Sequence, residues 1–250
     1  MLVMGILNVT PDSFADGGRH NDFEAAVARG LEMIAEGVDI IDIGGESTRP
    51  GADRVSEEEE IARTIPVIAE LAKHGTPISI DTMRASTAHA AVKVGASIIN
   101  DVSGGLADPH MLETAASLKV PYIAMHWRGQ SKDMNSKAIY ADVVNDVISE
   151  LNERIEVALT AGIQKDKLII DPGLGFAKDA EHNWAIVNSI DRFVAMGYPV
   201  LVGGSRKRFL GGESPDEREQ ATIQLTQRLS TTGVWAVRVH SVKPHKEVLG

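Results

Sequence analysis

One short segment sets the expected architecture: residues 38–46 read VDIIDIGGE, an apolar run that ends in two glycines and a carboxylate. Seven further apolar runs recur along the chain, and they read LVMGILNV, PISID, SIIND, PYIAMH, KLIIDPG, PVLVGG and WAVRVH. Short, nearly continuous apolar runs are typical of strands that are buried on both faces of a parallel sheet. We therefore expect eight buried strands.

The segments between these runs have the periodicity of amphipathic helices. Apolar residues recur at helical spacing in residues 23–36 and 61–71. Ser56 stands three residues before Glu59, which predicts a capping box at the start of the second of these helices. Glycines stand where six predicted helices end, at positions 37, 75, 95, 162, 197 and 233. A strand and a helix therefore alternate through the chain.

This alternation predicts an α/β protein in which residues 1–250 form a single domain, a (β/α)₈ TIM barrel. A doubly wound open sheet is the alternative, but it gathers its ligand residues at one switch point. Here a polar residue lies at or just beyond the end of every predicted strand: Asn8, Glu46, Asp81, Asn100, His126, Asp171, Ser205 and His240. That full ring favours the barrel. Ten residues follow His240, which predicts an eighth helix that is short or missing.

Composition excludes several functional classes. The 250 residues carry a net charge of −10, from 35 acidic and 25 basic residues, which argues against nucleic acid or an anionic membrane as a partner. The chain has no cysteine, which is compatible with a reducing cytosol, and it has no export signal and no apolar stretch long enough to cross a membrane. We expect a cytoplasmic protein.

Four polar residues at predicted strand ends are suited to bind a flat heterocycle. Asp81, Asn100 and Asp171 offer donors and acceptors in fixed directions, and Lys207 offers a mobile ammonium group. Salt bridges among the barrel ends are the alternative for any single residue, but four together favour a ligand site.

The last predicted strand carries a second kind of site. Arg238 and His240 alternate along it, so their side chains share a face and suit an anion such as diphosphate. Asn8, at the end of the first strand, offers a neutral oxygen to Mg²⁺, a metal that keeps waters and bridges phosphate oxygens. As a lone residue, Asn8 would be read as part of a turn.

Two long segments follow the first two strands, at 10–18 and 46–52, and are rich in turn-forming residues. In a barrel such loops commonly act as lids, and an ordinary exposed loop is the alternative. Six other histidines show no spacing that suggests a metal site or a catalytic pair, so we expect them on the solvated surface: His20, His74, His89, His110, His182 and His245.

Taken in order, these segments resemble dihydropteroate synthases of the folate pathway, over nearly the whole chain from Met4 to His240. The resemblance rests on NVTPDSF and DGG at 8–18, ESTRPG at 46–51, IDT at 80–82, INDVSGG at 99–105, DPGLGF at 171–176, SRK at 205–207 and RVH at 238–240. The first of these is highly specific for the family.

The resemblance implies condensation of (7,8-dihydropterin-6-yl)methyl diphosphate with 4-aminobenzoate, to give 7,8-dihydropteroate and diphosphate. It implies a pterin site formed by Asp81, Asn100, Met125, Asp171, Phe176 and Lys207, of which Asp81, Asp171 and Lys207 are the catalytic residues. It implies a diphosphate site formed by Asn8, Thr48, Arg238 and His240, with Mg²⁺ bound at Asn8. It implies a 4-aminobenzoate site formed by Phe14, Thr48, Arg49, Pro50 and Ser205. It also implies a homodimer and a target of sulfonamides.

The sequence departs from the family pattern at three places. Ser241 stands where an aspartate commonly follows the Arg-x-His strand, Gly204 stands where a residue with a side chain is more usual, and the segment after His240 is short.

Two other functions are the alternatives: a pterin-barrel methyltransferase that serves a corrinoid protein, and a non-catalytic pterin-binding paralogue. Both are disfavoured because the first two loops and the anion site persist. Tolerance to sulfonamides stays open, since it depends on the geometry around Phe14, Arg49 and Pro50.

Overall fold

Eight parallel strands form one sheet that curls into a barrel. The computed structural model describes residues 1–10, 18–46, 55–129 and 134–250. The strands are β1 (Leu2–Asn8), β2 (Ile40–Gly44), β3 (Ile78–Asp81), β4 (Ile98–Asp101), β5 (Tyr122–Met125), β6 (Leu168–Asp171), β7 (Leu201–Val202) and β8 (Ala236–Val239). Their order is β6-β5-β4-β3-β2-β1-β8-β7, and a parallel bridge between Ile170 and Val200 brings the two ends of this order together. The predicted TIM barrel is confirmed, and the open sheet is excluded.

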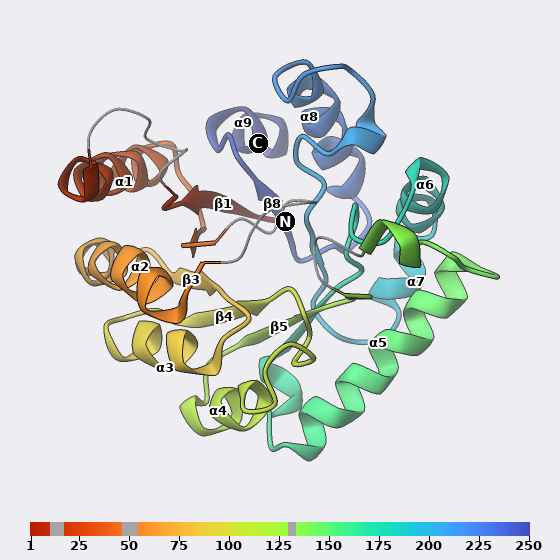
Figure 1. Ribbon diagram of the computed structural model, residues 1–250. Coiled ribbons are helices and arrows are strands. Elements are labelled where there is room, and N and C mark those ends of the chain that lie inside the picture. Colours follow the sequence, from red (N-terminus) through yellow and green to blue (C-terminus); the bar gives the residue numbers. More distant parts are fainter. Residues whose placement is uncertain (11–17, 47–54, 130–133) are drawn as a thin grey trace.

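Helices surround the strands in a ring, as Figure 1 shows. They are α1 (Gly18–Ala35), α2 (Glu57–Leu71), α3 (Ala85–Lys93), α4 (Met111–Leu118), α5 (Val143–Thr160), α6 (Ala180–Asn188), α7 (Ile190–Val194), α8 (Glu217–Leu229) and α9 (Lys243–Leu249). Short 3₁₀ turns are η2 (Ala72–His74), η3 (Met134–Lys137), η4 (Lys165–Lys167) and η5 (Arg208–Leu210). None of the helices in the described ranges is both long and apolar enough to span a membrane.

Side chains cap several of these helices at their first residues. Ser56 caps α2 by accepting a hydrogen bond from the Glu59 amide at 3.2 Å, which is one half of the predicted capping box. The first turn of α2 is acidic, which suits the positive end of the helix dipole. Asp179 and His182 form a reciprocal capping box at the start of α6. Such caps satisfy amide groups that have no partner within the helix.

The final helix is short, as predicted, and two contacts hold it in place. His245 Nδ1 lies 2.7 Å from the Thr226 hydroxyl of α8, and the histidine is fully buried. Lys246 Nζ donates to both oxygens of Asp39, at 3.1 and 3.0 Å. The expectation that His245 is solvated was wrong, because the turn after β8 directs it into the contact between α8 and α9 rather than outward.

Side chains of the strands fill the barrel in layers. A layer of seven buried apolar residues, which we call the apolar layer, consists of Met4, Ile40, Ile98, Ile123, Ile169, Leu201 and Ala236. Successive side chains on one side of a strand are two residues apart. The next interior positions toward the carboxyl ends therefore include Asp42, Asn100, Asp171 and Arg238, which we call the polar layer.

Candidate active site

Arg238 lies at the centre of a buried charge cluster. Its Nε donates to Asp42 Oδ2 at 2.6 Å, and its Nη2 donates to Asp81 Oδ2 at 2.7 Å. Asp42 Oδ2 also accepts a hydrogen bond from Asn100 Nδ2 at 3.1 Å. Strands β2, β3, β4 and β8 thus contribute to one network. One guanidinium and two carboxylates leave this cluster with an excess of negative charge.

Two carboxylate oxygens of this cluster are available to accept hydrogen bonds from a ligand. Within the described ranges, the Oδ1 atoms of Asp42 and Asp81 are buried and accept no hydrogen bond. A buried polar atom without a partner costs roughly 1–3 kcal/mol, which a ligand N–H group would offset. Burial raises the pKa of Asp81 to about 7; Arg238 opposes this shift, and the negative charge of Asp42 adds to it. A ligand that donates hydrogen bonds or carries positive charge is favoured here.

A second group of residues comes from β6 and β7. Asp171 is buried, and its Oδ1 accepts a hydrogen bond from the Gly173 amide at 2.7 Å. Lys207 Nζ donates to the Leu174 carbonyl and lies 4.5 Å from the centre of the Phe176 ring. Burial lowers the pKa of Lys207 to about 8, against the opposing charge of Asp171. Burial likewise raises the pKa of Asp171.

An apolar wall stands beside these polar groups. Met83, Val102 and Met125 form a small buried cluster, against which Phe176 and Trp127 pack. Met125 is the last residue of β5, and Phe176 belongs to the segment that follows β6. Flat apolar surface next to fixed donors and acceptors is the usual composition of a site for a heterocycle. Four of the predicted pterin residues thus lie at the neighbouring strand ends of β3 to β6, Phe176 lies in the loop after β6, and Lys207 reaches the same loop.

The predicted anion residues lie at the neighbouring strand ends. His240 Nδ1 lies within hydrogen-bond distance, 2.9 Å, of the Ser205 hydroxyl oxygen, and the His240 amide donates to the same oxygen at 3.2 Å. Asn8 ends β1, beside Gly44 of β2. Arg238 points toward Asp42 and Asp81, so its guanidinium binds two carboxylates and is only partly available to an anion. Its Nη1 has no hydrogen-bond partner among the described residues and is the atom left for a ligand.

Ser241 and Gly204, which depart from the family pattern, both fit the residues around them. Ser241 Oγ accepts a hydrogen bond from Arg206 Nη2 at 2.9 Å, and Glu219 of α8 binds Arg206 Nε at 2.6 Å. At Gly204 a Cβ atom would stand 2.6 Å from Leu225 Cδ2. The glycine therefore allows α8 to pack closely on the segment that follows β7.

Part of the predicted site lies outside the described residues. Phe14 falls in 11–17, and Thr48, Arg49 and Pro50 fall in 47–54. The residues that flank 47–54 are described: Arg84 after β3 donates to Glu46 Oε2 at 3.0 Å and also to the Val55 carbonyl. Arg84 also pairs with the buried Glu60 of α2. Arg84 thus joins the two ends of that segment to the barrel.

Among the buried charged residues that the sequence did not single out, two lie at the candidate site. Asp42 lies inside the apolar run of β2, and Lys178 follows β6 with an exposure of only 8%. For Asp42 a signal existed, because it is two residues after Ile40 and so shares the interior side of the strand. For Lys178 we find no local signal, since it stands in an irregular segment where an exposed lysine is the ordinary expectation.

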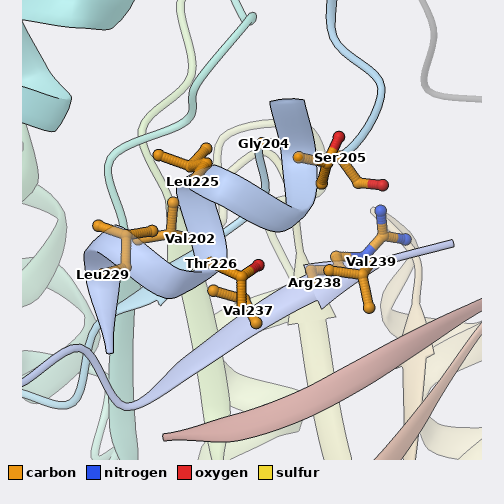
Figure 2. Close-up of a pocket in the computed structure, with 10 residues that line it drawn as sticks. Val202, Gly204, Ser205, Leu225, Thr226, Leu229, Val237, Arg238 and Val239 are labelled. Carbon is orange, nitrogen blue, oxygen red and sulfur yellow. The ribbon is translucent and has the colours of Figure 1, made fainter. Parts of the chain in front are cut away.

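Figure 2 shows a narrow gap between α8 and the last two strands. Its lining is mainly apolar, with Val202, Leu225, Leu229 and Val237 along it and Ser205 and Arg238 at one end. The gap therefore belongs to the packing behind the site. The candidate binding groups described above lie at the strand ends.

The geometry of the described residues limits how this site could hold a metal ion. Among the described residues, no group of three or more His, Asp or Glu side chains is placed to hold a metal ion. Asn8, whose side chain is half-buried at the strand end, offers a single neutral oxygen. The residues fit Mg²⁺ that brings its own waters and anionic substrate, and they do not fit a metal enclosed by protein ligands.

A closed parallel barrel with charged residues at its carboxyl ends defines the class of the protein: a (β/α)₈-barrel enzyme whose active site lies at that end. The sequence profile of the family described as pterin binding enzyme matches residues 4–240. A dihydropteroate synthase of Mycobacterium leprae is 48% identical over 257 residues, which cover 99% of this chain and 90% of the relative. The chain belongs to the dihydropteroate synthase family of pterin-binding enzymes.

Solved structures agree with this assignment. A Xanthomonas albilineans dihydropteroate synthase with 4-aminobenzoic acid superposes with a TM-score of 0.93 at 45% identity, covering 99% of this chain and 90% of that one. A structure of the enzyme from the same organism in complex with 7,8-dihydropteroate has a TM-score of 0.90 at 42% identity, with the same coverage.

Proposed function

We propose that this chain is a dihydropteroate synthase, which joins (7,8-dihydropterin-6-yl)methyl diphosphate to 4-aminobenzoate and releases diphosphate. Family membership over residues 4–240 supports the reaction. The observation in the site that carries the proposal is the pair of buried carboxylates, Asp81 and Asp171, on strands β3 and β6 beside the apolar wall of Met125 and Phe176.

The chemistry follows from where charge develops. When the bond between the methylene carbon and the diphosphate oxygen breaks, the electron pair leaves with diphosphate and positive charge spreads into the pterin ring. Ionised Asp81 and Asp171 stabilise that charge, because opposite charges attract strongly in a site with little water. The amine nitrogen of 4-aminobenzoate then forms a bond to the methylene carbon and loses a proton. Lys207 and Asn100 hold the heterocycle in place.

The departing diphosphate requires cationic and hydrogen-bonding partners. Arg238 Nη1 and the His240–Ser205 pair supply them at the strand ends of β7 and β8. Asn8 would hold Mg²⁺ against the diphosphate, and the bound ion would supply positive charge to the leaving group. The described residues contribute orientation and electrostatic stabilisation, and the reaction requires no nucleophile from the protein.

The test is product formation by the purified protein with pterin methyl diphosphate, 4-aminobenzoate and Mg²⁺, in the presence and absence of EDTA. We expect dihydropteroate only when free Mg²⁺ is present. Saturable pterin binding without product would instead indicate a non-catalytic paralogue. Methyl transfer from a folate to a corrinoid acceptor would indicate the rival barrel enzyme. If EDTA leaves product formation unchanged, the proposal that Asn8 binds Mg²⁺ is wrong.

Assembly and location form a further part of the proposal. We infer a homodimer in the cytoplasm, with residues 1–250 folded as one domain, because the family resemblance implies the dimer and the cysteine-free, acidic composition suits a reducing cytosol. Light scattering coupled to size-exclusion chromatography measures the mass in solution. A monomer at micromolar concentration would contradict the dimer.

A further inference from the structure

Lys178 is a buried lysine on the segment that follows β6. Its Nζ lies 2.9 Å from His126 Nδ1, 3.0 Å from the Gly173 carbonyl oxygen and 3.1 Å from the Phe176 carbonyl oxygen. An ammonium group has three N–H donors, and three partners surround this one. Full burial of lysine is rare unless such partners offset the loss of water.

The carbonyl groups that Lys178 binds belong to the loop of the proposed pterin site. Gly173 also donates its amide to Asp171 Oδ1, and Phe176 contributes its ring to the apolar wall. Between them, the Leu174 carbonyl accepts from Lys207. Two lysines thus hold three carbonyls of one short loop. The loop has little freedom elsewhere, since Gly173 has a φ of 70° and a Cβ atom there would stand 2.4 Å from the His126 carbonyl oxygen.

His126 connects Lys178 to the outside of the barrel. Because the ammonium group of Lys178 donates to Nδ1, the proton of the neutral imidazole resides on Nε2, which lies 2.9 Å from Glu150 Oε2 of α5. Burial, together with the positive charge of Lys178, lowers the pKa of His126 to about 4, so the ring is neutral near pH 7. Arg128 binds the same Glu150 and holds it in place.

We propose that Lys178 is a positioning residue for the pterin: it shapes the loop that carries Asp171 and Phe176, and its positive charge keeps Asp171 ionised. The inference rests on the proposed function. The charged groups that act on Asp171 are Lys207, Lys178 and Arg238, all of which lower its pKa against the effect of burial. Those that act on Lys178 are Asp171, Lys207, Arg128 and Glu150.

The sign of the expected pH effect follows from these charges. Burial lowers the pKa of Lys178 to about 7, so below that pH the residue is cationic and stabilises the Asp171 carboxylate. Removing this cation raises the pKa of Asp171. Pterin binding that needs ionised Asp171 is then lost at a higher pH than in the wild type.

The experiment compares Lys178→Met with Tyr140→Phe in the full-length protein. Methionine keeps the length of the side chain without charge or donor. Tyr140→Phe removes a neutral hydrogen bond to the same loop, the one from the hydroxyl to the Ala177 carbonyl at 3.0 Å. Steady-state kinetics give kcat and the KM for each substrate, and calorimetry gives pterin affinity between pH 5 and 9.

For Lys178→Met we expect the KM for the pterin diphosphate to rise about tenfold or more, the loss of roughly one charge-assisted hydrogen bond. The KM for the arylamine substrate stays at the wild-type value, and the acidic limb of pterin binding moves to higher pH. Tyr140→Phe leaves both KM values and the pH profile near those of the wild type. An equal rise in both KM values, or an unchanged pH profile, would overturn the proposal.

A second variant covers the case in which Lys178→Met does not fold. His126→Leu keeps Lys178 but removes one of its three partners, and we expect a several-fold rise in the KM for the pterin diphosphate alone. A wild-type KM in this variant would overturn the proposal. If the wild-type protein itself neither binds pterin nor forms product, the proposed function has failed. Turnover by the wild type with a normal pterin KM in both variants refutes only the role of Lys178.

Discussion

The apolar and polar layers of the barrel interior lie on the same strands and face the same side, yet they hold opposite kinds of residue. On β2, β4, β6 and β8 the two layers are a single pleat apart, as Ile169 and Asp171 are on β6. The apolar layer gains free energy by excluding water from its side chains. The polar layer loses free energy by burial and recovers it through hydrogen bonds and ion pairs. Residues that stabilise the fold and residues suited to chemistry are therefore separated within one barrel by about one pleat.

The largest effect is expected where the polar layer loses its central cation. Arg238→Met leaves Asp42 and Asp81 as buried carboxylates without a counter-charge, and we expect the free energy of unfolding to fall by about 3–5 kcal/mol at pH 8. The kcat/KM for the pterin diphosphate falls by about a hundredfold or more as well. Urea unfolding and steady-state kinetics measure the two effects.

The stability of Arg238→Met should also depend on pH, which unfolding measurements between pH 5 and pH 8 would show. Without the guanidinium, which opposes the rise, the folded-state pKa of Asp81 lies still further above its unfolded value near 4, so the folded state binds more protons between those two pKa values. Stability of the variant therefore falls as pH rises through this window and is greatest in mild acid. A loss of stability that is the same at pH 5 and pH 8 would contradict the role of Arg238 as a counter-charge.

The next largest effect belongs to the apolar layer. Ile169→Ala removes buried apolar volume and leaves a cavity, which we expect to lower the free energy of unfolding by about 2–5 kcal/mol. Both KM values remain near those of the wild type, because the residue touches only the packed interior. Asp171→Asn, one pleat away, is the matched control: it lowers kcat/KM with little loss of stability. If both variants lose activity and stability alike, the layers are not separable.

A smaller effect is expected from Lys207→Ala. The variant loses the cation beside the Phe176 ring, and we expect kcat/KM for the pterin diphosphate to fall by about a hundredfold, equivalent to roughly 2.7 kcal/mol. Lys73→Ala, at an exposed lysine paired with Glu70, is the matched control and should retain wild-type kinetics. Wild-type turnover by Lys207→Ala would remove this residue from the site.

The smallest effect is a shift in pH dependence. Burial raises the pKa of Asp81 to about 7 in the wild type, and the charge of Asp42 contributes to this rise. Asp42→Asn removes that charge and lowers the pKa of Asp81, so the acidic limb of the pH profile moves to lower pH by about one unit. The profile of kcat/KM for the pterin diphosphate reports the shift. A limb that stays near pH 7 would show that Asp81 is not the group that titrates.

The sequence predicted which polar residues stand at the strand ends but not how they are joined. Asp42 and Arg238 are 196 positions apart, and His126 and Lys178 are 52 apart, so their pairing depends on the closed barrel. The pairing of Arg238 in the predicted anion site was likewise not predictable from the sequence. The alternation along β8 predicted a shared face for Arg238 and His240, but the structure commits most of the Arg238 guanidinium to Asp42 and Asp81.

The order of strands and helices, the cap at Ser56 and the strand ends that carry polar residues could all be predicted from the sequence. These are local properties, because hydrophobic periodicity and capping act over a few residues. Which charges neutralise one another, why Gly204 lacks a side chain and how Lys178 comes to be buried became clear only from the folded chain. Those outcomes depend on distances between segments far apart in the chain, and burial sets the free energy of a charge only once such segments have packed together.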